Sequence, residues 1–176
     1  MSDHPSLPSP EAREAALLAR LAHLGITHRN YAHDPVFTVQ EAQALRGLVP
    51  GGHTKNLFLK DKKGGLWLVV AREDLAVDLK ALSKHLGCPR FSFGAPDLLI
   101  AVLGVPPGSV TPFALMNDPD TRVAVILDAG MMGHDPLNFH PLRNDRTIAV
   151  SPADLVKFMR DTGHEPQIVT LPERTG

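Results

Sequence analysis

The sequence has very little of what several large protein classes require. Only one of its 176 residues, Cys88, is a cysteine. An internal disulfide and a cysteine-built metal site are therefore excluded, and a reducing cytoplasm is the expected compartment. No apolar run approaches the length of a membrane span. Residues 1–10 are polar and proline-rich, without the charged and apolar regions of a signal peptide. We therefore expect a cytoplasmic protein with no membrane partner.

An excess of charge of either sign is also missing. The chain has 18 basic and 19 acidic residues, for a formal net charge of −1. A protein that coats nucleic acid non-specifically usually has a basic excess, so that class is disfavoured. A local basic patch that grips one RNA end stays open. The hydrophobic content of 43% is normal for a globular protein, and the length suits one domain with one sizeable core.

Capping residues mark the expected helices. Ser9-Pro10-Glu11 is a typical helix start, and Gly25 is the natural end of the apolar stripe that follows. A capping box at 38–41 predicts a short helix through about residue 46. Further helices are expected over 78–86, 96–103 and from Ser151 to Gly163.

Two strands, 57–60 and 66–71, are expected to form a hairpin through a glycine-containing turn. Other strands are expected at 90–93, 122–127, 146–150 and 167–170. Strands arriving in hairpins with helices between them predict an α/β (α+β) fold with a curved, mostly antiparallel mixed sheet flanked by helices. No repeat or linker divides the chain. We expect one domain over 11–171, a flexible segment over 1–10 and a tail over 172–176.

Lys55 and Asn56 stand where a polar stretch enters the first expected strand. A lysine at a strand edge is most often a solvated charge that discourages edge-to-edge association. The functional alternative is a compact cation for a phosphate or for developing oxyanion charge. Successive side chains of a strand point to opposite faces, so Asn56 shares a substrate with Lys55 only if the chain bends there.

The segment from Gly104 to Pro112 is rich in glycine and proline. Glycines let a backbone approach a ligand closely, and prolines stiffen a loop. Its exposed N–H and C=O groups could hold a ribose or an attacking water, but the pattern alone favours a rigid connector because it matches no phosphate-binding fingerprint.

His140, between Phe139 and Pro141, is one of 9 histidines. A histidine in such surroundings is more often a packed core residue than a catalytic base. Together with His134 and Asp135 it matches no compact zinc pattern, and we expect no metal site.

Lys80 and Lys84 are four residues apart on an expected helix and therefore share a face. That face could meet a tRNA acceptor stem, although an exposed helix face explains it equally well.

The order of several segments resembles the YbaK/ProX family of free-standing prolyl-tRNA editing proteins, most closely its alanyl-tRNA(Pro) deacylase branch. The resemblance covers nearly the whole chain, from about Glu11 to Leu171. The segments that carry it are Pro35–Val39, His53–Asp61, Leu66–Val70, Val77–Lys80, Gly108–Phe113, Asn117–Asp118, Asn138–Leu142 and Gly163–Pro166. Two loops, 130–136 and 143–146, depart from the family pattern and put the amino-acid preference in doubt more than the reaction type.

The resemblance implies a curved, barrel-like sheet flanked by helices, and hydrolysis of the ester that joins alanine to the terminal ribose without metal or organic cofactor. It implies that Lys55 holds the phosphate and ribose end of the tRNA, with Asn56 as its neighbour. It also implies that the Gly108–Pro112 loop, with Ser109 and Thr111, positions the substrate and the water through its backbone, and that His140 lies near the aminoacyl pocket. The implied partners are aminoacyl-tRNA(Pro) and prolyl-tRNA synthetase.

An aminoacyl ester is already activated, so positioning and modest electrostatic help suffice for its hydrolysis. A small pocket can exclude proline but not glycine or serine, which are expected side substrates. The alternatives are a deacylase for cysteinyl-tRNA or another small aminoacyl-tRNA, and a non-catalytic module that binds the acceptor stem or the synthetase.

Overall fold

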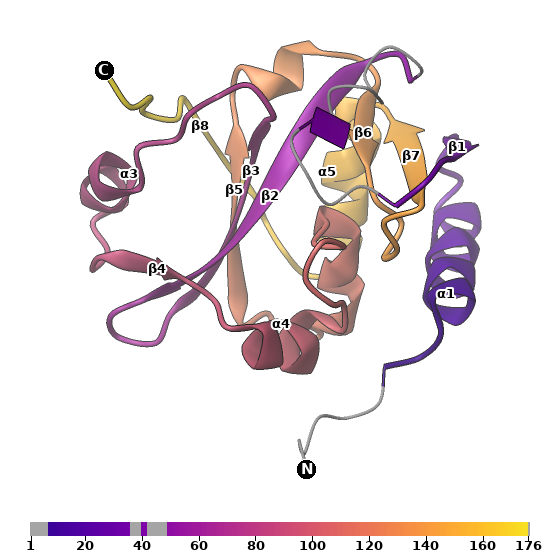
Figure 1. Ribbon diagram of the computed structural model, residues 1–176, viewed down its shortest axis with the longest axis horizontal. Coiled ribbons are helices and arrows are strands. Elements are labelled where there is room, and N and C mark those ends of the chain that lie inside the picture. Colours follow the sequence, from indigo (N-terminus) through magenta and orange to yellow (C-terminus); the bar gives the residue numbers. More distant parts are fainter. Residues whose placement is uncertain (1–6, 36–39, 42–48, 176) are drawn as a thin grey trace.

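The molecule is built on one mixed sheet of eight strands with helices on both faces (Figure 1). The computed structural model describes residues 7–35, 40–41 and 49–175. The strand order is β1-β7-β6-β2-β3-β5-β8, with β4 paired to β2. The strands are β1 (Arg29–Ala32), β2 (Gly52–Asp61), β3 (Leu66–Arg72), β4 (Phe91–Phe93), β5 (Val123–Asp128), β6 (Leu137–Phe139), β7 (Arg146–Val150) and β8 (Gln167–Val169). The helices are α1 (Pro10–His23), α3 (Leu79–Leu86), α4 (Pro96–Leu103) and α5 (Pro152–Asp161), with 3₁₀ turns η1 (Pro112–Asn117) and η2 (Met131–Gly133).

The predicted fold class is confirmed. The antiparallel pairs β1–β7, β6–β7, β2–β3 and β2–β4 outnumber the parallel pairs β2–β6, β3–β5 and β5–β8. Over the described residues the strand order begins at β1 and ends at β8, so this sheet is open and does not close into a barrel.

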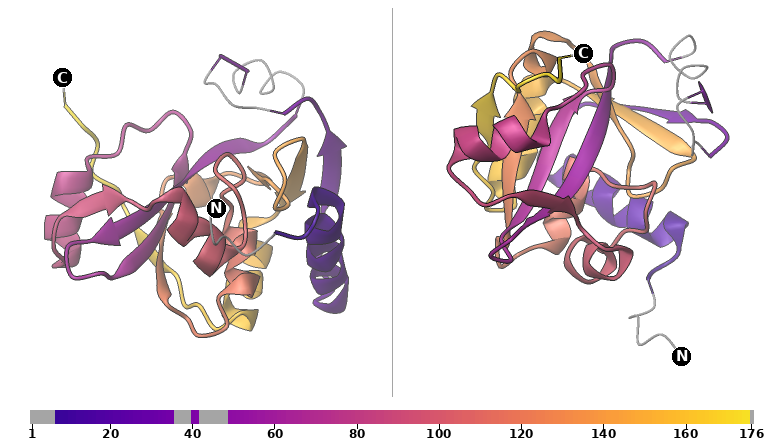
Figure 2. Two further views of the ribbon diagram at one scale, coloured as in Figure 1. Left: turned by 60° about the horizontal axis from the view of Figure 1, so that its bottom comes forward. Right: turned by 60° about the vertical axis from the view of Figure 1, so that its left-hand side comes forward.

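Strand β2 joins the two halves of the sheet. Its first residues pair in parallel with β6, most of its length pairs with β3, and its last residues pair with β4. Figure 2 shows β2 running from the β6–β7–β1 side of the molecule across to the β3–β5 side. The position of side chains on the first half of β2 therefore depends on its pairing with β6 as well as on its pairing with β3.

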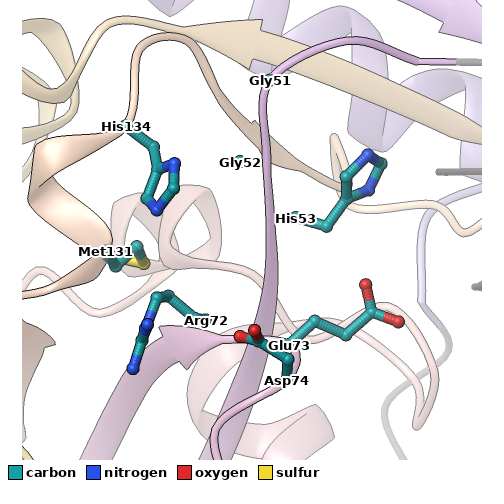
Figure 3. Close-up of a pocket in the computed structure, with 8 residues that line it drawn as sticks. All are labelled: Gly51, Gly52, His53, Arg72, Glu73, Asp74, Met131 and His134. Atoms are coloured by element: carbon teal, nitrogen blue, oxygen red, sulfur yellow. The ribbon is translucent and has the colours of Figure 1, made fainter.

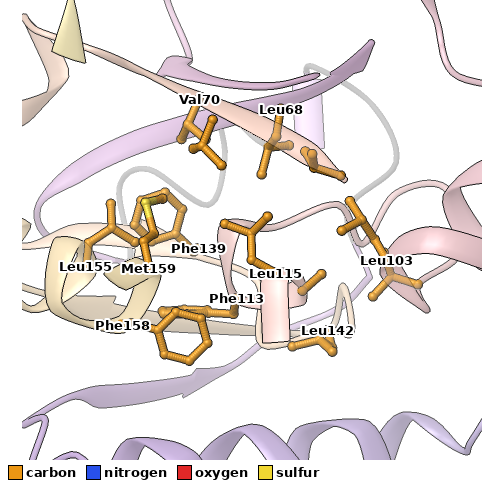
Figure 4. Close-up of a cluster of buried hydrophobic side chains, with 14 of the residues drawn as sticks. Leu68, Val70, Leu103, Phe113, Leu115, Phe139, Leu142, Leu155, Phe158 and Met159 are labelled. Carbon is orange, nitrogen blue, oxygen red and sulfur yellow. The ribbon is translucent and has the colours of Figure 1, made fainter. Parts of the chain in front are cut away.

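Two apolar cores lie on opposite faces of the sheet. The first core is filled from α1, α4, α5 and η1, and its largest members include Phe113 and Phe158 (Figure 4). The second core is smaller and is covered by α3 through Leu82. Alternation along β2 follows from this layering, because Phe58 enters the first core and Leu59 the second.

The helix starts agree with the capping predictions. The side chains of Ser9, Asp78 and Ser151 each accept a hydrogen bond from the main-chain N–H three residues on. Helix α3 ends at Gly87, which has the left-handed φ of 70°. Of the helix predicted over 38–46, only Gln40 and Glu41 belong to the described residues, and both are helical. No helix within the described ranges is long and apolar enough to cross a membrane.

Three features of the sheet differ from the sequence prediction. Strands β1 and β6 were not predicted, and β2 begins at Gly52 instead of residue 57. Strand β1 is largely exposed and polar, so it lacks the apolar alternation of an amphipathic strand. It is a strand because it pairs with β7, more than a hundred residues away.

The C-terminal segment is attached to the domain through the loop that precedes α3. Glu173 forms a β-bridge with Val77, and the main-chain N–H of Arg174 donates to the carbonyl of Ala76. Leu171, just before this segment, is buried in the second core. This attachment brings Arg174 close enough to Lys55 to affect its ionisation.

Candidate active site

Lys55 and Asn56 lie inside β2 and point to opposite faces of the sheet. Lys55 pairs with Ala71 of the second core, and Asn56 pairs with Val70 of the first core. The chain does not bend between them, since the register with β3 is continuous from Thr54 to Lys60. The two side chains therefore cannot share one ligand atom, as the alternation along the strand predicted.

Lys55 carries a half-buried ammonium. Burial lowers the pKa of Lys55 from its ordinary value, Arg174 adds to this effect, and Asp74 and Glu73 act against it. A partly desolvated cation interacts more strongly with a phosphate or an oxyanion than a fully hydrated one. The position suits a lysine that orients or stabilises negative charge.

Strand β6 places a second set of polar groups beside the start of β2. Asn138 pairs with His53 in parallel, and Thr54 Oγ1 donates to the Asn138 carbonyl at 2.6 Å. The pairing of the two strands covers only Gly52 with Leu137 and His53 with Asn138, so Lys55 and His140 each lie two residues beyond it. This pairing brings the start of β2 next to a segment more than eighty residues away in the sequence.

His140 is fixed by a hydrogen bond to the first residue of β7. Its Nδ1 lies 3.0 Å from the carbonyl oxygen of Arg146, and because a carbonyl only accepts, Nδ1 carries the hydrogen. Burial lowers the pKa of His140, and this outweighs the opposing effect of the Arg146 hydrogen bond. The neutral ring therefore has its free lone pair on Nε2.

Most residues of the Gly104–Pro112 loop are buried or half-buried. Ser109 and Thr111 are buried, and Thr111 Oγ1 accepts from the Phe113 N–H at the start of η1. Pro112 is the first residue of η1 and is buried as well. The Thr111 side chain is thus used within the loop, so any substrate contact of this residue would come from its backbone.

An aromatic contact connects this loop to β6. The ring of Phe113, next to Pro112, packs edge-on against Phe139 with centroids 5.8 Å apart. Phe139 directly precedes His140. Gly108, at the exposed tip of the loop, has a φ of 90°, which side-chain-bearing residues rarely adopt.

Gly108 therefore offers a test of the loop. We expect Gly108→Ala to lower the free energy of unfolding by about 1–3 kcal/mol through backbone strain. We also expect it to slow the expected hydrolysis of the aminoacyl ester about tenfold, because a displaced loop would misplace the substrate. Gly64→Ala is the matched control, because Gly64 has a φ of 88° with open space around it and lies in the β2–β3 turn. Equal losses of activity in both variants would contradict a role for the loop.

A pocket of about 270 Å³ opens at the start of β2, and Figure 3 shows its lining. It is lined by Gly51, Gly52, His53, Arg72, Glu73, Asp74, Met131 and His134. A side chain at Gly51 or Gly52 could not fit, because a Cβ at Gly51 would lie 2.6 Å from the Pro136 carbonyl and one at Gly52 would lie 2.9 Å from the His134 side chain. At these two glycines the wall of the pocket is therefore formed by main-chain atoms alone.

Charges of both signs meet at the pocket. Arg72 is held by Asp128, which accepts from its Nε at 3.3 Å and is itself buried. Glu73 and Asp74 are also the two carboxylates that act on the pKa of Lys55, so the pocket and the Lys55 ammonium are electrostatic neighbours. A ligand with both positive and negative groups is compatible with this arrangement.

Two buried amide oxygens near the site have no hydrogen-bond donor among the described residues. They are Asn56 Oδ1 and Asn138 Oδ1. The Asn138 amide is not reversed, because its Nδ2 donates to the carbonyls of Pro50 and Gly52. Asn138 thus holds the chain that leads into the pocket wall.

Lys80 and Lys84 are not brought to this surface. Both are exposed on α3, which packs beside β4 on the side of the molecule away from β6 and β7 (Figure 1). If these lysines bind a ligand, they contact a part of a large ligand that lies away from the pocket.

The described residues contain no cluster of three or more histidine, cysteine or acidic side chains that could hold a metal ion. Burial, with a smaller contribution from Asp61, raises the pKa of Cys88. That thiol is a poor nucleophile because little of it is ionised near neutral pH.

Sequence reasoning missed several residues of this surface. Arg72, Glu73 and Asp74 line the pocket only because β3 ends opposite the start of β2. His33 lies beside His140, with ring centroids 6.2 Å apart, because β1 pairs with β7. No local pattern marks these residues, since each depends on a pairing between distant strands.

Comparison with known proteins gives one consistent family. A family model described as aminoacyl-tRNA editing domain matches residues 33–158. The prolyl-tRNA synthetase associated domain-containing protein 1 of Bos taurus is 40% identical over 162 residues, which cover 89% of this chain and 94% of the relative. The prolyl-tRNA editing protein ProX of Acetoanaerobium sticklandii is 34% identical over 157 residues, covering 89% of this chain and 96% of the relative.

The fold is also found among solved structures. A crystal structure described as a trans-editing enzyme for prolyl-tRNA synthetase superposes with a TM-score of 0.71 at 21% identity. The match covers 95% of this chain and 99% of that chain. At 21% identity this likeness shows a shared fold and nothing more specific.

Proposed function

The chain belongs to the aminoacyl-tRNA editing domain family, and on that basis we propose that it is a trans-editing hydrolase that removes alanine from mischarged alanyl-tRNA(Pro). The observation that carries the proposal is the match of residues 33–158 to the family model, a stretch that contains both Lys55 and His140. The ester between alanine and the 3′-terminal ribose is the bond that is cleaved.

In this proposal Lys55 orients and does not attack. Its ammonium holds the phosphate and ribose end of the tRNA and stabilises negative charge as the ester carbonyl becomes tetrahedral. The half-buried position of Lys55 strengthens that interaction. The backbone at Gly108 and Pro112, with Ser109 and Thr111 between them, holds the terminal ribose and the water. Asn56 supports the strand from the opposite face. No cofactor is required, because the aminoacyl ester is already activated.

The pocket at the start of β2 is proposed to receive the aminoacyl end. Its volume of about 270 Å³ is at the lower limit of small-ligand sites. The close main-chain wall at Gly51 and Gly52 limits the space for a larger side chain. Proline is refused because it is bulkier than alanine, whereas smaller groups cannot be refused on size.

We therefore expect glycyl-tRNA(Pro) to be hydrolysed within about tenfold of the alanyl substrate, and prolyl-tRNA(Pro) at least about a hundredfold more slowly. The measurement is the rate of amino-acid release from one tRNA(Pro) transcript charged in turn with alanine, glycine, serine, cysteine or proline. Faster release of cysteine than of alanine would replace the substrate in this proposal with cysteinyl-tRNA. No release of any of the five would favour a non-catalytic acceptor-stem or synthetase-binding module.

The tRNA is proposed to extend from the pocket toward α3, with prolyl-tRNA synthetase as a second partner. The exposed cations of Lys80 and Lys84 would meet the phosphate backbone there. Changing both to glutamine should raise KM more strongly at low salt than at high salt and leave kcat unchanged. A KM that is independent of these lysines would remove them from the binding surface.

A further inference from the structure

His33, which directly follows β1, is held in place by its main chain and both ring nitrogens. Its main-chain N–H donates to the Asp145 carbonyl at 3.0 Å, and Nδ1 donates to the Asp34 carbonyl at 2.7 Å. Nε2 lies 2.8 Å from Oγ1 of Thr147, a residue that is 4% exposed. With Nδ1 committed as a donor, the neutral ring accepts the Thr147 hydroxyl proton at Nε2. A half-exposed histidine with this many fixed contacts is rigid.

His140 is the neighbour of this rigid ring. The two ring centroids are 6.2 Å apart with planes tilted by 50°. His140 Nδ1 donates to the Arg146 carbonyl, one residue before Thr147, so the same short stretch of β7 anchors both rings. The unprotonated Nε2 of His140 lies on the opposite side of its ring from that anchor.

We propose that His33 is a positioning residue that acts through His140, holding the His140 ring so that its Nε2 accepts a proton from the water that attacks the aminoacyl ester. The inference rests on the proposed function. In this proposal His33 contacts neither the water nor the ester. Its contact with Thr147 fixes it to β7, and β7 also carries the Arg146 carbonyl that anchors His140.

The step conserves atoms and charge. The water oxygen bonds to the ester carbonyl carbon while one water O–H bond breaks and its proton passes to His140 Nε2. When the tetrahedral intermediate collapses, the bond between that carbon and the ribose 3′-oxygen breaks, and the 3′-oxygen takes the proton from Nε2. The products are free alanine and tRNA with a 3′-hydroxyl.

The groups around His140 are compatible with a base that is neutral near pH 7. Burial has the largest effect on its pKa and lowers it. His33 beyond β1 lowers the pKa further, and Asp145 in the turn before β7 raises it. Arg146 faces the ring through its carbonyl. The charged groups on the described neighbouring elements do not reverse the direction set by burial.

The test is the pH dependence of single-turnover hydrolysis of alanyl-tRNA(Pro), measured from acid to neutral pH. The wild-type rate should fall as the pH drops through the lowered pKa of His140, because the base becomes protonated. His33→Asn should reduce the plateau rate about tenfold through misplacement of His140. It should also move the acid limb to higher pH, because the His33 ring that lowers the pKa of His140 has been removed.

Two variants of Thr147 and one distant histidine are the matched controls. Thr147→Val removes the hydroxyl and should lower the plateau like His33→Asn, whereas Thr147→Ser keeps the hydroxyl and should stay near wild type. His23→Asn changes an exposed histidine on α1 and should alter nothing. The inference is overturned if His33→Asn leaves both plateau and acid limb unchanged, or if Thr147→Ser loses as much as Thr147→Val.

Failure of the proposed function is distinguishable from failure of this inference. If the wild type releases no amino acid, the coupling of the rings is measured without substrate, as the NMR titration of the His140 ring in wild type and His33→Asn. An upward shift of the His140 midpoint in the variant, with an unchanged unfolding midpoint, supports the placement of the rings. An unshifted midpoint overturns it.

Discussion

Replacement of Lys55 by alanine is expected to slow hydrolysis of alanyl-tRNA(Pro) by at least about a hundredfold. Removal of one preorganised charge-stabilising group from an active site typically costs that much. Lys55 is half-buried in β2, and its pKa is lowered chiefly by burial. The effect should be on the rate of the chemical step, measured as release of labelled alanine under single-turnover conditions.

Lys60→Ala is the matched control, since Lys60 lies on the same strand and is exposed. It should hydrolyse the substrate at the wild-type rate. The wild-type rate, corrected for uncatalysed hydrolysis, should also fall at alkaline pH as Lys55 loses its proton, at a lower pH than for an ordinary lysine. A Lys55→Ala protein that is folded and within a few-fold of wild type would contradict the role given to this residue.

Asp118→Ala is expected to lower the free energy of unfolding by about 3–5 kcal/mol, because it removes a buried hydrogen-bonded carboxylate and leaves its three partners unsatisfied. The Asp118 carboxylate is 2% exposed and accepts from the N–H groups of Arg122 and Val123. It also faces His164 Nε2 at 2.9 Å. His164 is equally enclosed and contacts the Thr162 hydroxyl through Nδ1.

This network fastens the end of α5 to the turn before β5, which lies at the opposite end of the β2–β3 pair from the start of β2. Chemical denaturation with equal slopes for both proteins is the measurement. Asp120→Ala, in the same turn but exposed, should cost less than about 0.5 kcal/mol. The folded fraction of Asp118→Ala should keep the wild-type rate per molecule. A loss below about 1 kcal/mol would show that the network is not the anchor described here.

Local chemistry was sufficient to predict most of the helices. Ser9, Asp78 and Ser151 cap helices as expected, because a cap depends on a side chain and the three residues after it. The β2–β3 hairpin was predicted for the same reason, since its turn residues are adjacent in the chain.

Elements defined by distant pairing were not predictable in this way. Strand β6 is only Leu137–Phe139, and it owes its conformation to β2 and β7 on either side. The polar start of β2 carries no strand pattern of its own, yet Gly52 and His53 are held by β6, and Thr54 is paired with β3. Long-range pairing overrides local propensity at these positions.

The candidate site also contains residues that the sequence could indicate and contacts that only the structure reveals. Lys55, the Gly108–Pro112 loop and His140 were selected by resemblance, and their individual roles remain predictions. The relation of Lys55 to Asn56 followed from alternation along a strand and is seen in the structure. The contact of His33 with His140 and the charges at the pocket depend on which strands meet, so only the structure reveals them.

The most direct test of the central claim is the rate at which purified wild-type protein releases amino acid from alanyl-tRNA(Pro), alanyl-tRNA(Ala) and prolyl-tRNA(Pro) in parallel. We predict rapid release from alanyl-tRNA(Pro) and rates near the uncatalysed value for the other two, because the pocket excludes proline and the RNA end distinguishes the acceptors. Equal release from both alanyl-tRNAs, or no release from alanyl-tRNA(Pro), would contradict the claim.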